Sequence, residues 1–296
     1  MALGHVASGP RRMRQVRGAH AASGASNLHA ADQRPAVRSS VAAADATFRK
    51  IVARAAARFR SAGRGPHYFA RGKLSGDPVF AALLRDGRIA AGARIVDVGC
   101  GLGVLAALLV AAEECEARAA FEWPAGWPPA PRRWTLQGFD LRERAIANAQ
   151  RALTDVADRV EFAVADMRTA ALPQCDLMFM LDVAHYIDRD AQRALFRHAE
   201  QALVPGGTLL IRVGDGLSGV RFYLSMIGDW VTMLARGTPW PRLHFRSVTE
   251  WIALLQDTGF VVSSQPMSQG TPFANVLLIA HKPKVAQPLA VAFESG

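Results

Sequence analysis

The sequence has few cysteines and no long apolar run. Three cysteines occur among 296 residues, at Cys100, Cys115 and Cys175, and none belongs to a C-x-x-C pair. This spacing argues against a zinc site and against a disulfide framework. It is typical of a reducing compartment, so we expect a cytoplasmic protein that holds no metal. No uninterrupted apolar stretch reaches the roughly 18 residues that a membrane-spanning helix needs.

Acidic residues are nearly missing from the N-terminal quarter. Residues 1–73 contain 14 Lys and Arg but only two acids, Asp32 and Asp45, which gives +12; the total is +10, so the remaining residues sum to −2. A nucleic-acid-binding fold usually carries its positive charge on the fold itself. The distribution therefore argues against nucleic acid as the partner of the main domain.

Residues 1–40 are rich in Ala, Arg, Ser and Gly and poor in large apolar side chains. They cannot bury enough surface to offset the entropy of the chain, so we expect a disordered basic extension. The pair Arg11-Arg12 lacks the apolar segment of an export signal. The composition also fits a transit peptide, but an extension without a targeting role is the simpler interpretation.

Residues 41–90 predict a helical cap. Apolar side chains recur at helical spacing within 41–60, with arginines opposite, which favours packing on the domain or, alternatively, on a membrane surface. The stripe consists of Phe48, Ile51, Val52, Ala55 and Phe59. Further on, Asp77 and Pro78 are typical of a helix start, and Gly87 of its end.

From Arg94 onward, apolar strand patterns alternate with helical ones, which predicts an α/β fold with a parallel sheet covered on both faces. The expected strands are 94–98, 134–139, 160–164, 176–181, 207–213, 260–265 and 275–281. The expected helices lie near 103–113, 142–153, 189–203, 219–235 and 247–258. The stretch 121–133 predicts a Pro- and Trp-rich surface loop.

A glycine-rich turn, IVDVGCGLGVLA at residues 95–106, follows the first strand. Doubly wound folds bind their ligands at this turn, where glycine lets the backbone approach the ligand closely. The dinucleotide-binding pattern G-x-G-x-x-G requires Gly or Ala at position 104, where this sequence has Val104. The phosphate-loop pattern is also absent, because the Lys it requires does not follow the glycines. Asp97 would repel a pyrophosphate, so it favours a ligand with a cationic end.

The pattern D-V-G-C-G-x-G resembles motif I of the class I S-adenosylmethionine-dependent methyltransferases. GFDLRERAIANAQ, EFAVADMR and LVPGGTLLIRV resemble later motifs of the same family, in order, within residues 90–283. The resemblance implies S-adenosylmethionine as cofactor. It also implies a Rossmann-like, doubly wound, seven-stranded mixed sheet whose last strand is antiparallel. The methyltransferase domain would then be residues 91–283, followed by a flexible tail at 284–296.

The resemblance also implies a cofactor site. Asp140, at the end of the second strand, would accept hydrogen bonds from the ribose hydroxyls, and Asp166 with Met167 would hold the adenine. A basic residue ahead of motif I would pair with the cofactor carboxylate, first Arg71 and second Lys73. Taken singly, Asp140 has an alternative explanation as a helix cap and Asp166 as an ordinary turn residue. The full expected set is Asp97, Gly99, Cys100, Gly101, Gly103, Asp140, Leu141, Asp166, Met167, Asp182 and Arg71.

The methyl acceptor is expected at the exits of the fourth and fifth strands. Family members that methylate amino groups of nucleobases carry a Pro-Pro-aromatic element here, and its absence after Asp182 argues against that subclass. His185 is the first candidate general base because its ordinary pKa lies near neutrality, with positioning of the loop as the alternative. His244 is the second candidate base. Tyr186 and Arg212 are candidate substrate contacts, with packing and solvation as their alternatives.

Residues 219–235 predict an apolar, aromatic-rich helix that would form a lid over the acceptor or, alternatively, pack in a core of its own. The candidate lining is Phe222, Tyr223, Met226 and Trp230. The stretch YFARGKLSGDPVFAALL weakly resembles methyltransferases of bacterial aryl-polyene pigment clusters. That resemblance implies a phenolic acceptor carried on an acidic acyl carrier protein, which a basic arm would attract.

We therefore expect an enzyme that methylates a small molecule in secondary metabolism. Two alternatives remain open, an RNA methyltransferase that uses the basic arm and a non-catalytic protein that binds S-adenosylmethionine. The oligomeric state and the methylated atom do not follow from the residues.

Overall fold

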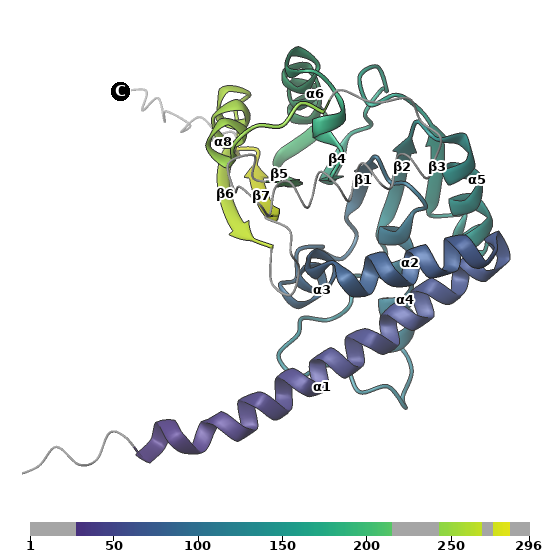
Figure 1. The fold of residues 1–296 in the computed structure, drawn as a ribbon, viewed down its shortest axis with the longest axis vertical. Coiled ribbons are helices and arrows are strands. Elements are labelled where there is room, and N and C mark those ends of the chain that lie inside the picture. Colours follow the sequence, from purple (N-terminus) through teal and green to yellow (C-terminus); the bar gives the residue numbers. More distant parts are fainter. Residues whose placement is uncertain (1–27, 215–242, 268–274, 285–296) are drawn as a thin grey trace, which may run out of the picture. The chain divides into compact units, whose positions relative to one another are not determined.

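The computed structural model describes residues 28–214, 243–267 and 275–284 (Figure 1). The chain divides into two units, Met1–Ala42 and Ala43–Gly296. Helix α1 (Leu28–Arg58) begins in the first unit, so residues 28–40 are helical where we expected disorder. The fold described below is that of the second unit.

The core of the second unit is one seven-stranded sheet with the order β3-β2-β1-β4-β5-β7-β6. The strands are β1 (Arg94–Val98), β2 (Thr135–Asp140), β3 (Val160–Val164), β4 (Cys175–Leu181), β5 (Leu203–Gly214), β6 (Val261–Pro266) and β7 (Asn275–His281). Strand β7 is antiparallel to both of its neighbours, and the other pairs are parallel. The expected doubly wound mixed sheet is confirmed. Its strand order changes direction between β1 and β4, where such folds bind ligands.

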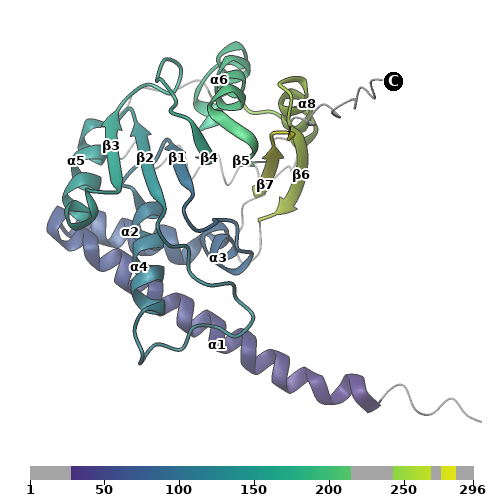
Figure 2. The same cartoon turned by 180° about the vertical axis from the view of Figure 1, so that it is seen from behind.

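Alternating side chains of the strands enter two separate apolar cores. Ile95 packs in the first core and its neighbour Val96 in the second, because successive strand residues point to opposite faces. The first core is covered by the end of α1 and by α2 (Arg64–Gly76), α3 (Pro78–Arg85), α4 (Val104–Glu116) and α5 (Glu143–Ala152). The second is covered by α6 (Arg189–Ala202) and α8 (Val248–Asp257), as Figure 2 shows from behind.

The cap contains two short helices, α2 and α3, ahead of the first strand. The Asp77 side chain caps α3 by accepting a hydrogen bond of 3.2 Å from the Val79 backbone, as expected. Helix α2 lies within the expected helical cap, but its bounds were not predicted, because Gly65, Pro66 and Gly72 hide its helical pattern. The proline lies in the first turn, where it is tolerated, and buried Leu74 holds the helix to the core.

The end of α1 is held by the predicted apolar stripe and by ion pairs. Ile51, Val52, Ala55 and Phe59 are buried, and Phe48 packs against Trp127 of the Pro- and Trp-rich loop at a ring distance of 6.5 Å.

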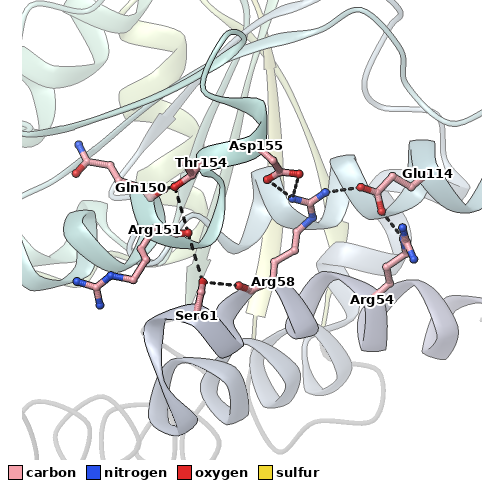
Figure 3. A network of polar contacts seen from close by, with 8 residues as sticks. All are labelled: Arg54, Arg58, Ser61, Glu114, Gln150, Arg151, Thr154 and Asp155. Carbon is pink, nitrogen blue, oxygen red and sulfur yellow. Dashed lines mark hydrogen bonds and ion pairs between the residues drawn. The ribbon is translucent and has the colours of Figure 1, made fainter.

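Figure 3 shows the polar side of this anchor. Arg54 and Arg58 both pair with Glu114 of α4, and the Arg58 Nη1 atom lies 2.7 Å from the Asp155 carboxylate. Ser61 then donates to the Arg151 backbone carbonyl of α5. The loop and the arginines therefore fasten the end of α1, from Phe48 onward, to the rest of the second unit.

The predicted lid at 219–235, with Phe222, Tyr223, Met226 and Trp230, lies outside the described residues, as does the tail after residue 284. In the part of the chain that the structure describes, no helix is both long and apolar enough to cross a membrane.

Candidate functional site

The loop after β1 requires glycine at three positions. Gly99, Gly101 and Gly103 have backbone φ angles of +74°, +58° and +71°, which residues with a side chain rarely adopt. A Cβ atom on Gly99 would lie 2.3 Å from Val183, and one on Gly103 would lie 2.5 Å from Phe162. The loop is therefore bare backbone at the carboxyl end of the sheet, and it leads directly into α4.

Of the acids near this loop, Asp97 has the most strongly shifted pKa. Asp97 is 5% exposed, and none of the described residues donates a hydrogen bond to its carboxylate. Burial, and then the charge of Asp140, raise the pKa of Asp97 to about 7. The same burial, together with the charge of Asp97, raises the pKa of the Cys100 thiol far above its usual range, which makes this thiol inert.

Two further acids lie at the ends of the neighbouring strands, as expected. Asp140 ends β2 and accepts hydrogen bonds of 2.9 Å from the Gly101 and Arg142 backbones. Asp166 follows β3 and is chelated by Arg168, whose hydrogen bonds hold the pKa of this carboxyl below its usual range. Leu141, next to Asp140, is 66% exposed, whereas Met167 is half-buried against the second core.

A buried ion-pair cluster joins the cap to β4 and β5. Arg212 of β5 pairs with Asp77 of the cap and with Asp182 after β4, and it is 3% exposed. The alternative that Arg212 is solvated is therefore wrong. Burial alone would raise the pKa of Asp77, but the charges of Arg212 and Lys73 outweigh it and lower this pKa.

The exposed side of this cluster is Lys73, whose Nζ atom lies 3.0 Å from both Asp77 and Asp182. Arg71, the first-ranked partner for the cofactor carboxylate, is instead exposed on α2. Asp182 adopts φ +60°, a left-handed conformation that is uncommon outside glycine and is more frequent for Asp than for most residues. Lys73 therefore reaches the carboxyl edge in the place where we expected Arg71.

His185 is buried in an aromatic stack after β4. It is 4% exposed and lies parallel to Phe245, with ring centroids 4.9 Å apart and planes 15° from each other. Tyr186 packs against it at 4.3 Å. Burial lowers the pKa of His185 to about 4, so the ring is neutral at pH 7 and a weak base. This favours the positioning role that the sequence left open over general-base catalysis.

Gln192 holds this region together, and no motif pointed to it. Its side chain is fully buried and donates to the backbone carbonyls of Ala184, Ile187 and His244 at 2.9–3.1 Å. Its Oε1 atom accepts from Arg246 at 2.7 Å. One glutamine of α6 therefore joins the loop after β4 to the segment before α8. A buried amide inside an amphipathic helix is the signal that could have found it.

A cavity of about 300 Å³ lies against β2 and β3, and none of the predicted site residues lines it. Its walls come from the middle of the two strands and from the loop before β4, including Gln137, Glu161 and Leu172. The acids and glycines described above lie instead at the carboxyl ends of β1 to β4. The candidate site is therefore this edge of the sheet.

The glycine loop, the strand-end acids and the sheet order agree with one protein family. The profile described as "Methyltransferase domain" matches residues 44–265. The chain belongs to this family. The matched residues run from the end of α1 through α2 and α3 and across the sheet as far as β6. Its cofactor is S-adenosylmethionine, in agreement with the resemblance of its motifs.

Solved structures share the fold. An O-methyltransferase family protein from Burkholderia thailandensis is 19% identical, with a TM-score of 0.52, over 77% of this chain and 63% of that one. The S-adenosylmethionine-dependent methyltransferase SibL is 21% identical, with a TM-score of 0.54, over 74% and 58%. A methyltransferase from Mesorhizobium loti is 22% identical, with a TM-score of 0.50, over 70% and 99%.

At these identities the likeness shows the fold and no more. This chain spans about three-fifths of the length of the first two proteins. No curated protein sequence matches it.

Proposed function

We propose that this methyltransferase domain methylates a small-molecule acceptor at the carboxyl edge of the sheet. The observation that carries the proposal is the pairing of a bare glycine loop with Asp97, a buried carboxylate that receives no hydrogen bond from the described residues. A buried carboxylate is stabilised by an opposite charge nearby. S-adenosylmethionine brings such a charge, whereas a dinucleotide would bring a repelling pyrophosphate.

The residues present fit this cofactor. We assign the close backbone approach to Gly99, Gly101 and Gly103, with Cys100 packed behind them. Asp140 with Leu141 would hold the ribose, and Asp166 with Met167 the adenine. Asp182, fixed by Arg212, would face the methionine end of the cofactor, and Lys73 beside it is a better candidate than the exposed Arg71 for the cofactor carboxylate.

The chemistry asks little of the protein beyond alignment. When bound, S-adenosylmethionine supplies an electrophilic methyl group, so the protein must bring the acceptor in line with it. His185 supports the loop after β4 as a neutral ring, and Tyr186 beside it is available for acceptor contact. His244, whose backbone is tied to His185 at 2.8 Å, remains the candidate general base. The proposed acceptor contacts Phe222, Tyr223, Met226 and Trp230 lie outside the described residues.

For the acceptor we favour a phenolic or carrier-bound aryl compound. The charge of +12 on residues 1–73 would attract an acidic carrier protein, which supports the proposal that the acceptor is delivered bound to such a carrier. An RNA methyltransferase remains the alternative for the same charge, and a non-catalytic binder of S-adenosylmethionine is the second alternative. No Pro-Pro-aromatic element follows Asp182, which weighs against methylation of base amino groups in RNA.

The test is transfer of a radiolabelled methyl group from S-adenosylmethionine into an extract of the organism. Label in the small-molecule or carrier-bound fraction, resistant to nuclease, would support the proposal. Nuclease-sensitive label would support RNA, and the absence of label despite binding would support the non-catalytic alternative. Asp140→Ala should abolish transfer, whereas Asp158→Asn, which removes an exposed carboxylate on a turn away from the edge, should leave it unchanged.

A further inference from the structure

The sequence Asp-x-Arg occurs at the ends of both β2 and β3. In Asp140-Leu141-Arg142 and in Asp166-Met167-Arg168, the arginine backbone N–H donates to the Oδ1 atom of the aspartate at 2.9 Å. In both, the guanidinium also folds back and chelates the two carboxylate oxygens. The two acids assigned above to the ribose and the adenine are thus covered in the same way.

Hydrogen bonds from the protein itself fill the acceptor positions of the Asp140 carboxylate. A carboxylate has about four acceptor positions, two on each oxygen. Oδ1 accepts from the Arg142 backbone and Nε at 2.9 Å each, and Oδ2 accepts from Gly101 at 2.9 Å and from Arg142 Nη2 at 3.1 Å. All four positions are taken. Withdrawal of the guanidinium would free one on each oxygen, while the two backbone donors would keep the carboxylate in place.

The guanidinium also covers the glycine loop. A Cβ atom on Gly101 would lie 3.3 Å from Arg142 Nη2, so this group rests on the face of the loop that glycine leaves open. The Arg142 side chain is 43% exposed, whereas that of Asp140 is 9% exposed. The arginine can therefore move into solvent without disturbing the core, and the aspartate cannot.

We propose that Arg142 and Arg168 occupy the ribose and adenine positions, so that cofactor binding is an exchange of guanidinium donors for nucleoside donors. The inference rests on the proposed function. Two ribose hydroxyls would replace the two side-chain hydrogen bonds of Arg142, and the adenine amine would replace contacts of Arg168. The exchange keeps Asp140 hydrogen-bonded in both states. Because partly exposed ion pairs contribute little, the exchange is reversible at small cost.

The test is calorimetric titration of the full chain with S-adenosylhomocysteine, which carries no net charge and is therefore insensitive to a distant charge change. Arg142→Ala should bind about two- to fivefold more tightly than the wild type, because no ion pair has to be broken. Arg168→Ala should shift in the same direction. Arg151→Ala is the matched control, since it removes an exposed arginine from the last turn of α5, at the other end of this helix from Asp140, and it should bind like the wild type.

Binding of the wild type together with equal or weaker binding of Arg142→Ala would refute this inference and leave the proposed function standing. Weaker binding would mean that Arg142 contacts the ligand or holds Asp140 in place. Absence of heat from all four proteins, with native circular dichroism, would refute both. Arg142→Lys, which keeps the charge but cannot chelate, should lie between the wild type and the alanine variant.

Discussion

Replacing Asp97 with Asn should stabilise the protein and weaken cofactor binding. The carboxyl is 5% exposed and its pKa is raised from an ordinary 3.8 to about 7. This difference corresponds to on the order of 4 kcal/mol of disfavoured ionisation in the folded state. We expect a measured gain of about 2 to 4 kcal/mol at pH 8, since relaxation of the surroundings lowers the cost.

The stability gained by Asp97→Asn should depend on pH. Below about pH 4 the carboxyl is protonated in both states, so the variant should gain nothing there. Between pH 4 and 7 the unfolded chain loses the proton first, so the wild type loses stability as the pH rises. The gain of the variant should therefore grow through this window and level off above pH 7. Urea unfolding of wild type and Asp97→Asn at pH 4 and pH 8 measures it.

Asp158→Asn provides the control, because it removes an exposed carboxylate and should change the free energy of unfolding by less than about 0.5 kcal/mol at either pH. The same Asp97 variant should bind S-adenosylhomocysteine at least about tenfold more weakly, since a charged hydrogen bond is worth roughly 1.5 kcal/mol or more. A variant no more stable than wild type at pH 8, or equally stabilised at both pH values, would refute the reasoning.

Three further substitutions test the architecture of the edge. Arg212→Ala should cost about 3 to 5 kcal/mol in urea unfolding because it strands a buried carboxylate, whereas Lys73→Ala, at the exposed side of the cluster, should cost less than about 1 kcal/mol. Gly99→Ala should abolish methyl transfer and lower thermal stability, since its Cβ has no room; Gly126→Ala, with φ +84° in open space, should show only the backbone cost of about 1 kcal/mol. Gln192→Ala should speed hydrogen exchange in the loop after β4 and in the segment before α8 together, and exchange in one segment alone would contradict its bridging role.

The sheet could be predicted because its strands are short apolar runs separated by turn residues. The bounds of each expected strand lie within a few residues of the observed ones. The positions of Asp97, Asp140 and Asp166 at or near the ends of strands followed from that pattern. The helical cap was expected, but the bounds of α2 within it were not, because glycine and proline interrupt its pattern. The stability of α2 comes from tertiary packing of Leu74 rather than from propensity.

Long-range pairing could not be predicted from local pattern. Arg212 finds Asp77 across the fold, so its burial follows from the topology and not from its neighbours in sequence. Burial lowers the pKa of His185, and part of its surroundings, the stacked ring of Phe245, comes from the distant segment before α8. The contacts of Arg142 and Arg168 with their acids are local, but spacing alone does not distinguish a solvated arginine from one that folds back onto a carboxylate.

The most direct test of the account is a crystal structure of the protein with S-adenosylhomocysteine. We expect the ribose hydroxyls within hydrogen-bonding distance of Asp140, the adenine beside Asp166 and Met167, and the amino acid end over the glycine loop above Asp97. Density for the ligand elsewhere, or a nicotinamide dinucleotide bound at this edge in its place, would contradict it.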